Sequence, residues 1–143
     1  MKTTKPAPDL FLMNQNPSIF KCHWQVPGGQ PQIHDGHNVI TKVNEMTYQV
    51  AGIIAPNFFQ LVFNIRNEYT DGTYEIIPRE QYEQNKKGVF LGLAQGGLIW
   101  DDLVGSCTFT SGERFKLTFE ATNPSGFEFK MGEIEVDRFL KTK

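Results

Sequence analysis

The chain has 143 residues, of which 39% are hydrophobic and 21% are charged, and twelve of them are phenylalanine. This length and composition suit a single domain spanning residues 1–143 with one buried core, and they argue against a disordered chain. The formal net charge is -2 and no long basic run occurs, which argues against nucleic acid as a partner because phosphate binding needs a dense basic surface.

The beginning of the sequence carries no recognisable targeting segment. Lys2 and Lys5 are not followed by an apolar stretch long enough for a signal sequence. Nowhere do about 18 apolar residues run together, as a transmembrane helix requires. We therefore expect a soluble protein that is cytoplasmic or exported without a leader, with no transmembrane segment and with residues 1–8 flexible.

Alternation of apolar and polar residues dominates the sequence and predicts β-strands, because successive side chains of a strand point to opposite faces. In the first third of the chain the clearest example is residues 18–26, where Phe20, Cys22 and Trp24 share one face. Weaker patterns predict further strands at 10–13, 38–43 and 47–54. Cys22 and Cys107 both lie in such apolar patterns, so we expect two buried thiols rather than a disulfide.

The remaining strands follow at regular intervals. Residues 59–66 and 114–121 alternate as clearly as the first strand, and shorter segments at 73–77, 89–93, 98–100 and 106–110 are predicted between them. A short helical turn on the surface is predicted at 78–87, because this segment begins with Pro78, stops before Gly88 and contains a single large apolar residue, Tyr82. Glycine-containing turns separate the strands.

The last strand has an irregular apolar pattern. Its apolar positions are odd-numbered from Phe127 to Met131 and even-numbered from Ile134 to Val136, with Gly132 between the two sets. A β-bulge at Gly132 would return both sets to one face. Together the predicted elements indicate an all-β protein, an antiparallel β-sandwich with one short surface helical turn.

Three histidines lie close together in the sequence and raise the question of a metal site. His23 would point away from Cys22 on the first strand, and His34 and His37 lie in a glycine-rich loop rather than on a helix that would align two imidazoles. We therefore expect no metal and no cofactor. Convergence of His23, His34 and His37 with a carboxylate, which would make an enzyme, is the alternative.

Neighbouring acidic residues could suggest a glycosidase, because hydrolysis of a glycosidic bond uses two carboxyl groups on opposite sides of the bond. Glu133 and Glu135 instead lie on the polar face of one strand, and Asp101 and Asp102 follow Trp100 into a turn. We therefore expect that the protein is not an enzyme.

Three polar and aromatic loops favour binding instead. They span residues 26–30, 64–71 and 98–102. Sugars are bound by aromatic faces that pack on the sugar ring, flanked by Asn, Asp and Arg side chains that bond to its hydroxyls. Trp100, at a strand end beside two aspartates, is either a core residue or such a platform.

The N-terminal order of Asn16-Pro17, Phe20, Trp24, Gly28-Gly29 and Asp35-Gly36-His37 resembles that of the fungal fruit-body lectins. Residues 58–71 are similar to the central strand and following loop of that family, and residues 112–136 to its C-terminal hairpin. The resemblance implies an actinoporin-like β-sandwich that recognises glycans without metal or catalysis. Residues 126–136 are also similar to the terminal strand of jelly-roll carbohydrate-binding modules.

The resemblance implies roles for individual residues. Asn67 would bond to sugar hydroxyls, Tyr69 would be its aromatic neighbour, and Gly28 and Gly29 would form a loop that the sugar approaches closely. With Asp71 and Trp100 these are the predicted ligand-binding residues.

The sequence leaves two alternative functions and the oligomeric state open. Actinoporin-like folds also include lipid-binding and pore-forming proteins. An inhibitor or immunity module that binds another protein is a further alternative. A lectin would gain avidity as a homo-oligomer.

Overall fold

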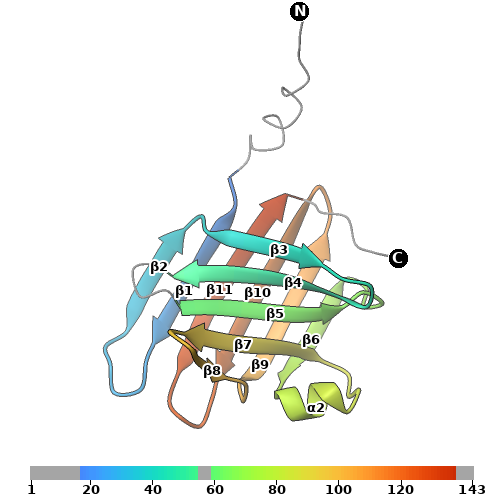
Figure 1. Ribbon diagram of the computed structural model, residues 1–143. Coiled ribbons are helices and arrows are strands. Elements are labelled where there is room, and N and C mark those ends of the chain that lie inside the picture. Colours follow the sequence, from blue (N-terminus) through green and yellow to red (C-terminus); the bar gives the residue numbers. More distant parts are fainter. Residues whose placement is uncertain (1–16, 55–58, 138–143) are drawn as a thin grey trace, which may run out of the picture.

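The structure is a computed structural model that describes residues 17–54 and 59–137 (Figure 1). These residues form eleven strands and one short helix, α2 (Arg79–Glu83). The strands are β1 (Ile19–Gln25), β2 (Gln32–Gly36), β3 (Val39–Val43), β4 (Thr47–Ile54), β5 (Phe59–Arg66), β6 (Gly72–Ile77), β7 (Val89–Gln95), β8 (Leu98–Trp100), β9 (Val104–Ser111), β10 (Arg114–Thr122) and β11 (Glu128–Asp137). The all-β prediction is confirmed. The strand predicted at 10–13 and the flexible segment predicted at 1–8 lie outside the described residues.

All eleven strands belong to one sheet, in the order β2-β1-β11-β10-β9-β6-β7-β5-β4-β3, with β8 paired to β7. Neighbouring strands are antiparallel, except that β6 and β7 run parallel where Ile76 pairs with Val89. The prediction of a wholly antiparallel sheet is wrong at this pair. The reason is that the chain crosses over through α2 between β6 and β7 and so returns in the same direction.

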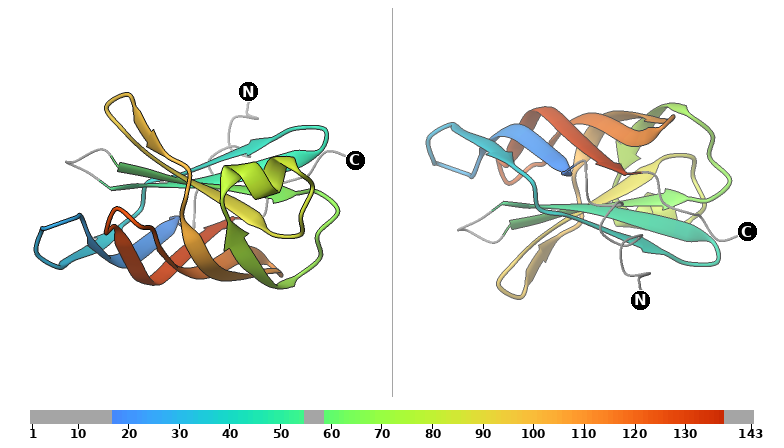
Figure 2. Two further views of the ribbon diagram at one scale, coloured as in Figure 1. Left: turned by 90° about the horizontal axis from the view of Figure 1, so that it is seen from below. Right: turned by 90° about the horizontal axis from the view of Figure 1, so that it is seen from above.

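The sheet curls, so that one half of it lies over the other (Figures 1 and 2). We call β3, β4, β5, β7 and β8 the front half and the remaining strands the back half. The strands of the two halves cross at a steep angle, and the β6–β7 pair connects them. A sandwich was predicted, but hydrogen bonding here runs unbroken through one curled, open sheet.

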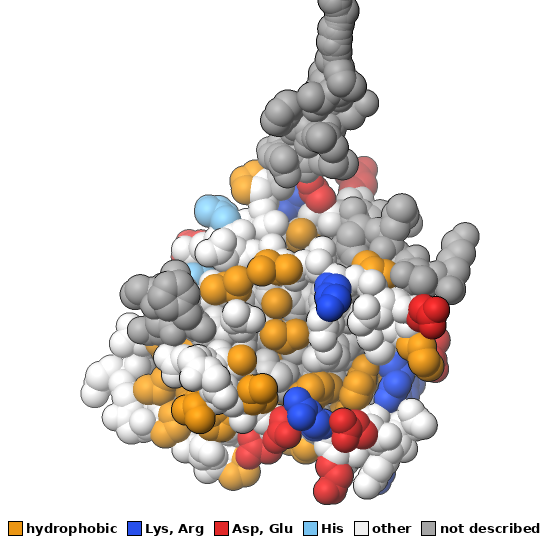
Figure 3. Space-filling view, viewed as in Figure 1, with side chains coloured by type: hydrophobic (Ala, Val, Ile, Leu, Met, Phe, Trp, Pro, Cys, Tyr) orange, Lys and Arg blue, Asp and Glu red, His pale blue; other side chains and the backbone are white. Residues whose placement is uncertain are grey.

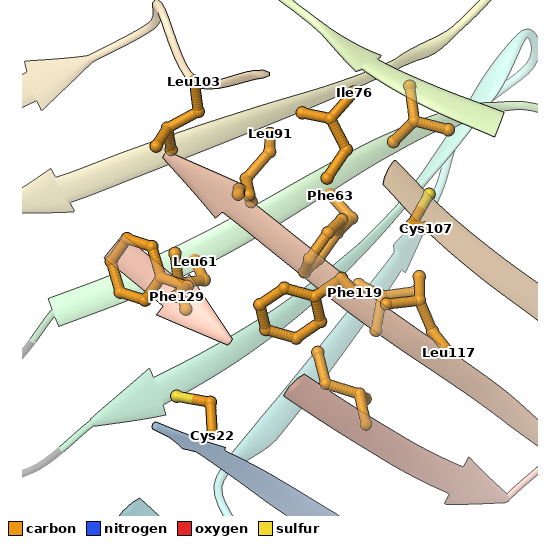
Figure 4. Packing of buried hydrophobic residues seen from close by; sticks show 14 of the residues in the cluster. Cys22, Leu61, Phe63, Ile76, Leu91, Leu103, Cys107, Leu117, Phe119 and Phe129 are labelled. Carbon is orange, nitrogen blue, oxygen red and sulfur yellow. The ribbon is translucent and has the colours of Figure 1, made fainter. Parts of the chain in front are cut away.

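The core fills the space between the two halves (Figure 4). The long strands of both halves send alternate side chains into it, as the sequence pattern predicted. Phe63 of the front half meets Phe119 of the back half with ring centroids 4.8 Å apart, edge to face. Cys22 and Cys107 lie in the same core as free, buried thiols, which confirms their prediction.

The helix α2 was predicted from the sequence, whereas strand β2 was not. The short helix α2 buries none of its residues, so the predicted surface helical turn is confirmed. Strand β2 was expected to be a loop. Among the described strands it pairs with β1 alone, from Phe20–Gly36 to Trp24–Gln32, and most of its side chains are exposed, so no apolar alternation marks it.

The bulge predicted at Gly132 is confirmed. Phe119 pairs with Gly132 and Ala121 with Phe129, so two residues of β11 stand opposite one residue of β10. The extra residue, Met131, has a positive φ of 52° and is 73% exposed. The prediction that Met131 shares the buried face is therefore wrong, because the bulge turns this side chain outward.

Candidate functional site

Three of the predicted ligand-binding residues, Asn67, Tyr69 and Asp71, lie together in an open depression at the end of β5. The loop from β5 to β6 forms most of it and the β9–β10 hairpin forms the rest. Its lining residues are Asn67, Glu68, Tyr69, Thr70, Asp71 and Ser111. We call it the loop depression.

The side chains of Asn67 and Asp71 form hydrogen bonds to neighbouring loops of the protein. The Asn67 side-chain amide donates to the backbone oxygens of Asn44 and Glu45, at 3.0 and 2.9 Å, and so holds the β3–β4 turn. The Asp71 carboxylate accepts from the backbone N–H and the hydroxyl of Ser111, at 3.0 and 2.6 Å. Both side chains therefore have a structural role that needs no ligand.

Tyr69 is similarly engaged. Its ring stacks on that of Tyr74, with centroids 4.6 Å apart and planes 11° from parallel. Its hydroxyl accepts a hydrogen bond from the backbone N–H of Gly88 at 3.0 Å. One face of the Tyr69 ring is thus covered by protein, which leaves less of it for a sugar.

The other predicted residues lie at the opposite end of the molecule. Gly28 has a positive φ of 72° in the β1–β2 turn, and Pro27 beside it packs against Gly126 of the β10–β11 loop. The ring of Trp100 lies 4.8 Å from that of Phe127, in the same loop. Trp100 is partly buried against the core.

The two groups of predicted residues do not form one site. Strand β5 begins at Phe59, whose ring is 6.1 Å from Phe127, and ends next to Asn67. An eight-residue strand spans about 25 Å. Gly28, Gly29 and Trp100 are therefore separated from the loop depression by about the length of this strand.

A second hollow lies on the outer face of the back half, over β9, β10 and β11. It holds about 370 Å³, near the lower end of the range for small-ligand sites. We call it the bulge groove, and its lining residues are Ser106, Cys107, Thr108, Thr118, Phe119, Glu120, Met131, Gly132 and Glu133. None of them was among the residues that the sequence predicted to bind a ligand.

The bulge gives the groove its apolar surface. On the inner face of the sheet, Gly132 lies over the Phe119 ring, where an added Cβ would be 2.3 Å from ring carbon Cε1, so that contact belongs to the core. Met131 is turned outward next to Gly132 and exposes its thioether. The Met131 side chain therefore supplies a small apolar area on an otherwise polar sheet face.

Hydroxyl and carboxylate groups surround this apolar area. Ser106 pairs across strands with Glu120, and Thr118 pairs with both Thr108 and Glu133. Their side chains point outward because the alternate residues of these strands fill the core. Thr108 bonds to Thr73 at 2.8 Å between the two hydroxyl oxygens.

The sequence did not predict the bulge groove, because the alternation of apolar and polar residues identifies outward-facing residues one strand at a time. Which strands lie side by side, and hence which polar residues meet, is not contained in that pattern. The one local signal was the change of parity at Gly132, which predicted the bulge but not the groove that it creates.

The three histidine side chains have different surroundings in the structure. The His37 Nδ1 atom is 2.7 Å from the backbone oxygen of Ser18. The His34 ring lies 4.9 Å from that of Phe20, and burial lowers the pKa of His34, against an opposing effect of Asp35. His23 is exposed on β1. In the described part of the chain, no group of three or more His, Cys, Asp or Glu side chains could hold a metal ion.

Comparisons with protein-family models, with curated proteins and with solved structures found no match in any of the three. Among residues 17–54 and 59–137, no helix has the length and apolar character needed to cross a membrane.

Proposed function

We propose that this protein is a non-catalytic carbohydrate-binding protein and that the bulge groove is its glycan site. The observation that carries the proposal is the combination of an apolar side chain, Met131, with hydroxyls and carboxylates around it on the same sheet face. A sugar presents the same combination, since its C–H face is apolar and its hydroxyls both donate and accept hydrogen bonds.

The groove also keeps its polar groups available. In the described part of the protein, no hydrogen bond or ion pair occupies the side chains of Ser106, Glu120 and Glu133. The loop depression differs, because Asn67 and Asp71 are bonded to the backbone or side chains of neighbouring loops. A ligand there would compete with contacts that hold the loops together, so the groove is the better site.

The two resemblances found in the sequence both imply carbohydrate binding, and both stay predictions. The similarity of residues 126–136 to carbohydrate-binding modules covers β11, which carries the bulge. The similarity to fungal fruit-body lectins, and the actinoporin-like sandwich that it implies, concerns Asn67 and Tyr69 instead. The second site is therefore included in the test below.

A glycan-array screen of the full chain tests the proposal. We expect binding to a related set of glycans, and a loss of at least tenfold in the double variant Glu120→Gln, Glu133→Gln, which keeps side-chain size but removes both charges. Lys116→Gln is the matched control, because Lys116 is an exposed residue on the same face of β10 outside the groove.

Thr70→Ala separates the two hollows, because Thr70 lines the loop depression and no hydrogen bond engages its side chain in the described residues. Its binding should equal that of the wild type. Absence of any glycan binding would refute the function, and a loss in Thr70→Ala alone would move the site to the loop depression. Circular dichroism spectra must show that each variant is folded.

The other functions considered from the sequence also stay predictions. Leakage of dye from liposomes would detect a pore-forming protein. Sedimentation measured with and without the glycan found on the array would detect a homo-oligomer.

A further inference from the structure

The outward side of the front half carries a row of apolar residues, with polar residues such as Lys42, Gln49 and Gln60 beside it. Four residues from four strands form a row across it, because Ile40 pairs with Ala51, Ala51 with Val62, and Val62 with Gly92. Apolar side chains gather over the centre of this face in Figure 3. We call this surface the front face, and its other apolar residues are Ile53, Ala94 and Ile99.

Residues at the margins of the front face are largely exposed, whereas Ala51 at its centre is 9% exposed. Ile40 is 57% exposed and Ile99 is 62% exposed. Ala51 and Gly92 have little or no side chain, so another segment could approach the backbone closely. Exposed apolar patches of this kind usually mark an interaction surface.

The size of the front face argues for a short segment as its occupant. Five strands, spaced by about 4.8 Å, and five residues of about 3.3 Å along each give about 400 Å². A stable dimer buries at least about 600 Å² on each partner. A second copy of the chain would therefore be held weakly through this face alone.

The sequence contains a suitable segment next to the described residues. Leu10, Phe11, Leu12 and Met13 form an uninterrupted apolar run that ends four residues before Pro17. An extended chain covers about 3.3 Å per residue, so Met13 lies within about 13 Å of Pro17 and Leu10 within about 23 Å.

The chain enters the described region beside the front face. The backbone oxygen of Ser18 is 2.7 Å from Nδ1 of His37, and His37 precedes the edge strand β3 by two residues. The backbone oxygen of Pro17 accepts from the Arg114 guanidinium at 2.8 Å, which fixes this entry point. Along the row, Ile40 and Val62 are two strand spacings apart, about 10 Å, so residues 10–13 can reach both.

We propose that the segment Leu10-Phe11-Leu12-Met13 docks on the front face of its own chain. The link between segment and face is only a few residues long, which makes docking intramolecular and gives a high effective concentration. Weak apolar contacts are then sufficient. This inference does not depend on the proposed glycan site, which lies on the back half.

Disulfide trapping in the full chain tests the docking. Phe11→Cys combined with Val62→Cys places one thiol in the segment and one in the centre of the front face. In the control, Phe11→Cys is combined with Thr118→Cys on the back half. The natural Cys22 and Cys107 are buried and do not compete. Under mild oxidation we expect a monomeric disulfide in the first pair, formed at least tenfold faster than in the control and independently of protein concentration.

Two results would overturn the inference. Equal rates for the two pairs would mean that the segment does not prefer the front face. Disulfide-linked dimers whose yield rises with concentration would mean that a second copy occupies it. As a second measurement, Phe11→Asp with Leu12→Asp should increase the fluorescence of an apolar dye, 1-anilinonaphthalene-8-sulfonate, several-fold, and unchanged fluorescence would also count against docking.

Discussion

Phe119 and Gly132 touch across the β10–β11 pair, with the aromatic ring of one lying against the backbone of the other. A Cβ at position 132 would be 2.3 Å from Cε1 of the ring and 2.4 Å from Cζ, closer than real Cβ contacts. The contact explains why position 132, next to the bulge, is glycine. Only glycine lets β11 pass over the ring, and the extra residue of the bulge then turns Met131 outward.

Replacing Gly132 by alanine should therefore destabilise the fold. The added methyl group must displace a core aromatic ring, and overpacking of this kind costs about 1–3 kcal/mol. Chemical denaturation of Gly132→Ala measures the loss. Gly112→Ala is the control, because a Cβ there would meet nothing within 4 Å, and an equal effect of the two changes would show that the contact is not constraining.

Asn67→Ala should lower stability without lowering glycan affinity. The variant removes two hydrogen bonds to the β3–β4 turn, and the expected cost is about 1–2 kcal/mol for a partly exposed pair. Denaturation and glycan binding are measured on the same sample. A stable variant that no longer binds glycan would contradict the structural role and favour the loop depression as the site.

Replacing Arg114 should lower the free energy of unfolding more than replacing most other charged residues. Its guanidinium bonds to Glu135 at 2.6 Å, to Asp137 and to the backbone oxygen of Pro17, and its side chain is only 16% exposed. Lysine cannot reproduce this forked geometry, so Arg114→Lys should cost about 1–3 kcal/mol of unfolding free energy.

Lys116→Met serves as the comparison for Arg114. Lys116 lies 3.8 Å from Glu135 but is 60% exposed, and exposed pairs contribute about 0–1 kcal/mol. Losses of similar size in Arg114→Lys and Lys116→Met would argue against a special role for Arg114.

The buried thiols predict a loss of stability in alkali. Burial raises the pKa of Cys22 and of Cys107 from 9.0 to about 12. Between these values the unfolded chain loses the thiol protons and the folded chain keeps them, so the stabilising effect is complete below pH 9 and declines above it. In this range each thiol should lower the free energy of unfolding by about 1.4 kcal/mol per pH unit.

Denaturation at pH 8 and pH 10 measures this decline, and Cys107→Ala should reduce it. Burial also raises the pKa of the Tyr48 hydroxyl, which adds to the loss at still higher pH. If Cys107→Ala and the wild type lose the same free energy between pH 8 and pH 10, the thiol contributes nothing.

Most of the strands could be predicted from the sequence, because a half-buried strand alternates. Strand β2 could not, since it is an edge strand with mostly exposed side chains and so has no alternation. The parallel β6–β7 pair and the curling of the sheet depend on which strands become neighbours. Alternation fixes the faces of each strand but not its partners.

The candidate site was less predictable than the fold. Asn67, Tyr69 and Asp71 are adjacent in sequence, and the structure uses them to hold loops. The bulge groove combines Ser106, Thr118 and Glu133 from three strands, which no single segment of sequence brings together.

The measurement that tests the central claim most directly is a ¹⁵N–¹H nuclear magnetic resonance titration of the full chain with a panel of neutral hexoses and N-acetylhexosamines. Binding in the bulge groove predicts saturable shift changes at the amides of residues 106–108, 118–120 and 131–133, with residues 67–71 unchanged. Shift changes confined to residues 67–71, or none with any sugar of the panel, would contradict it.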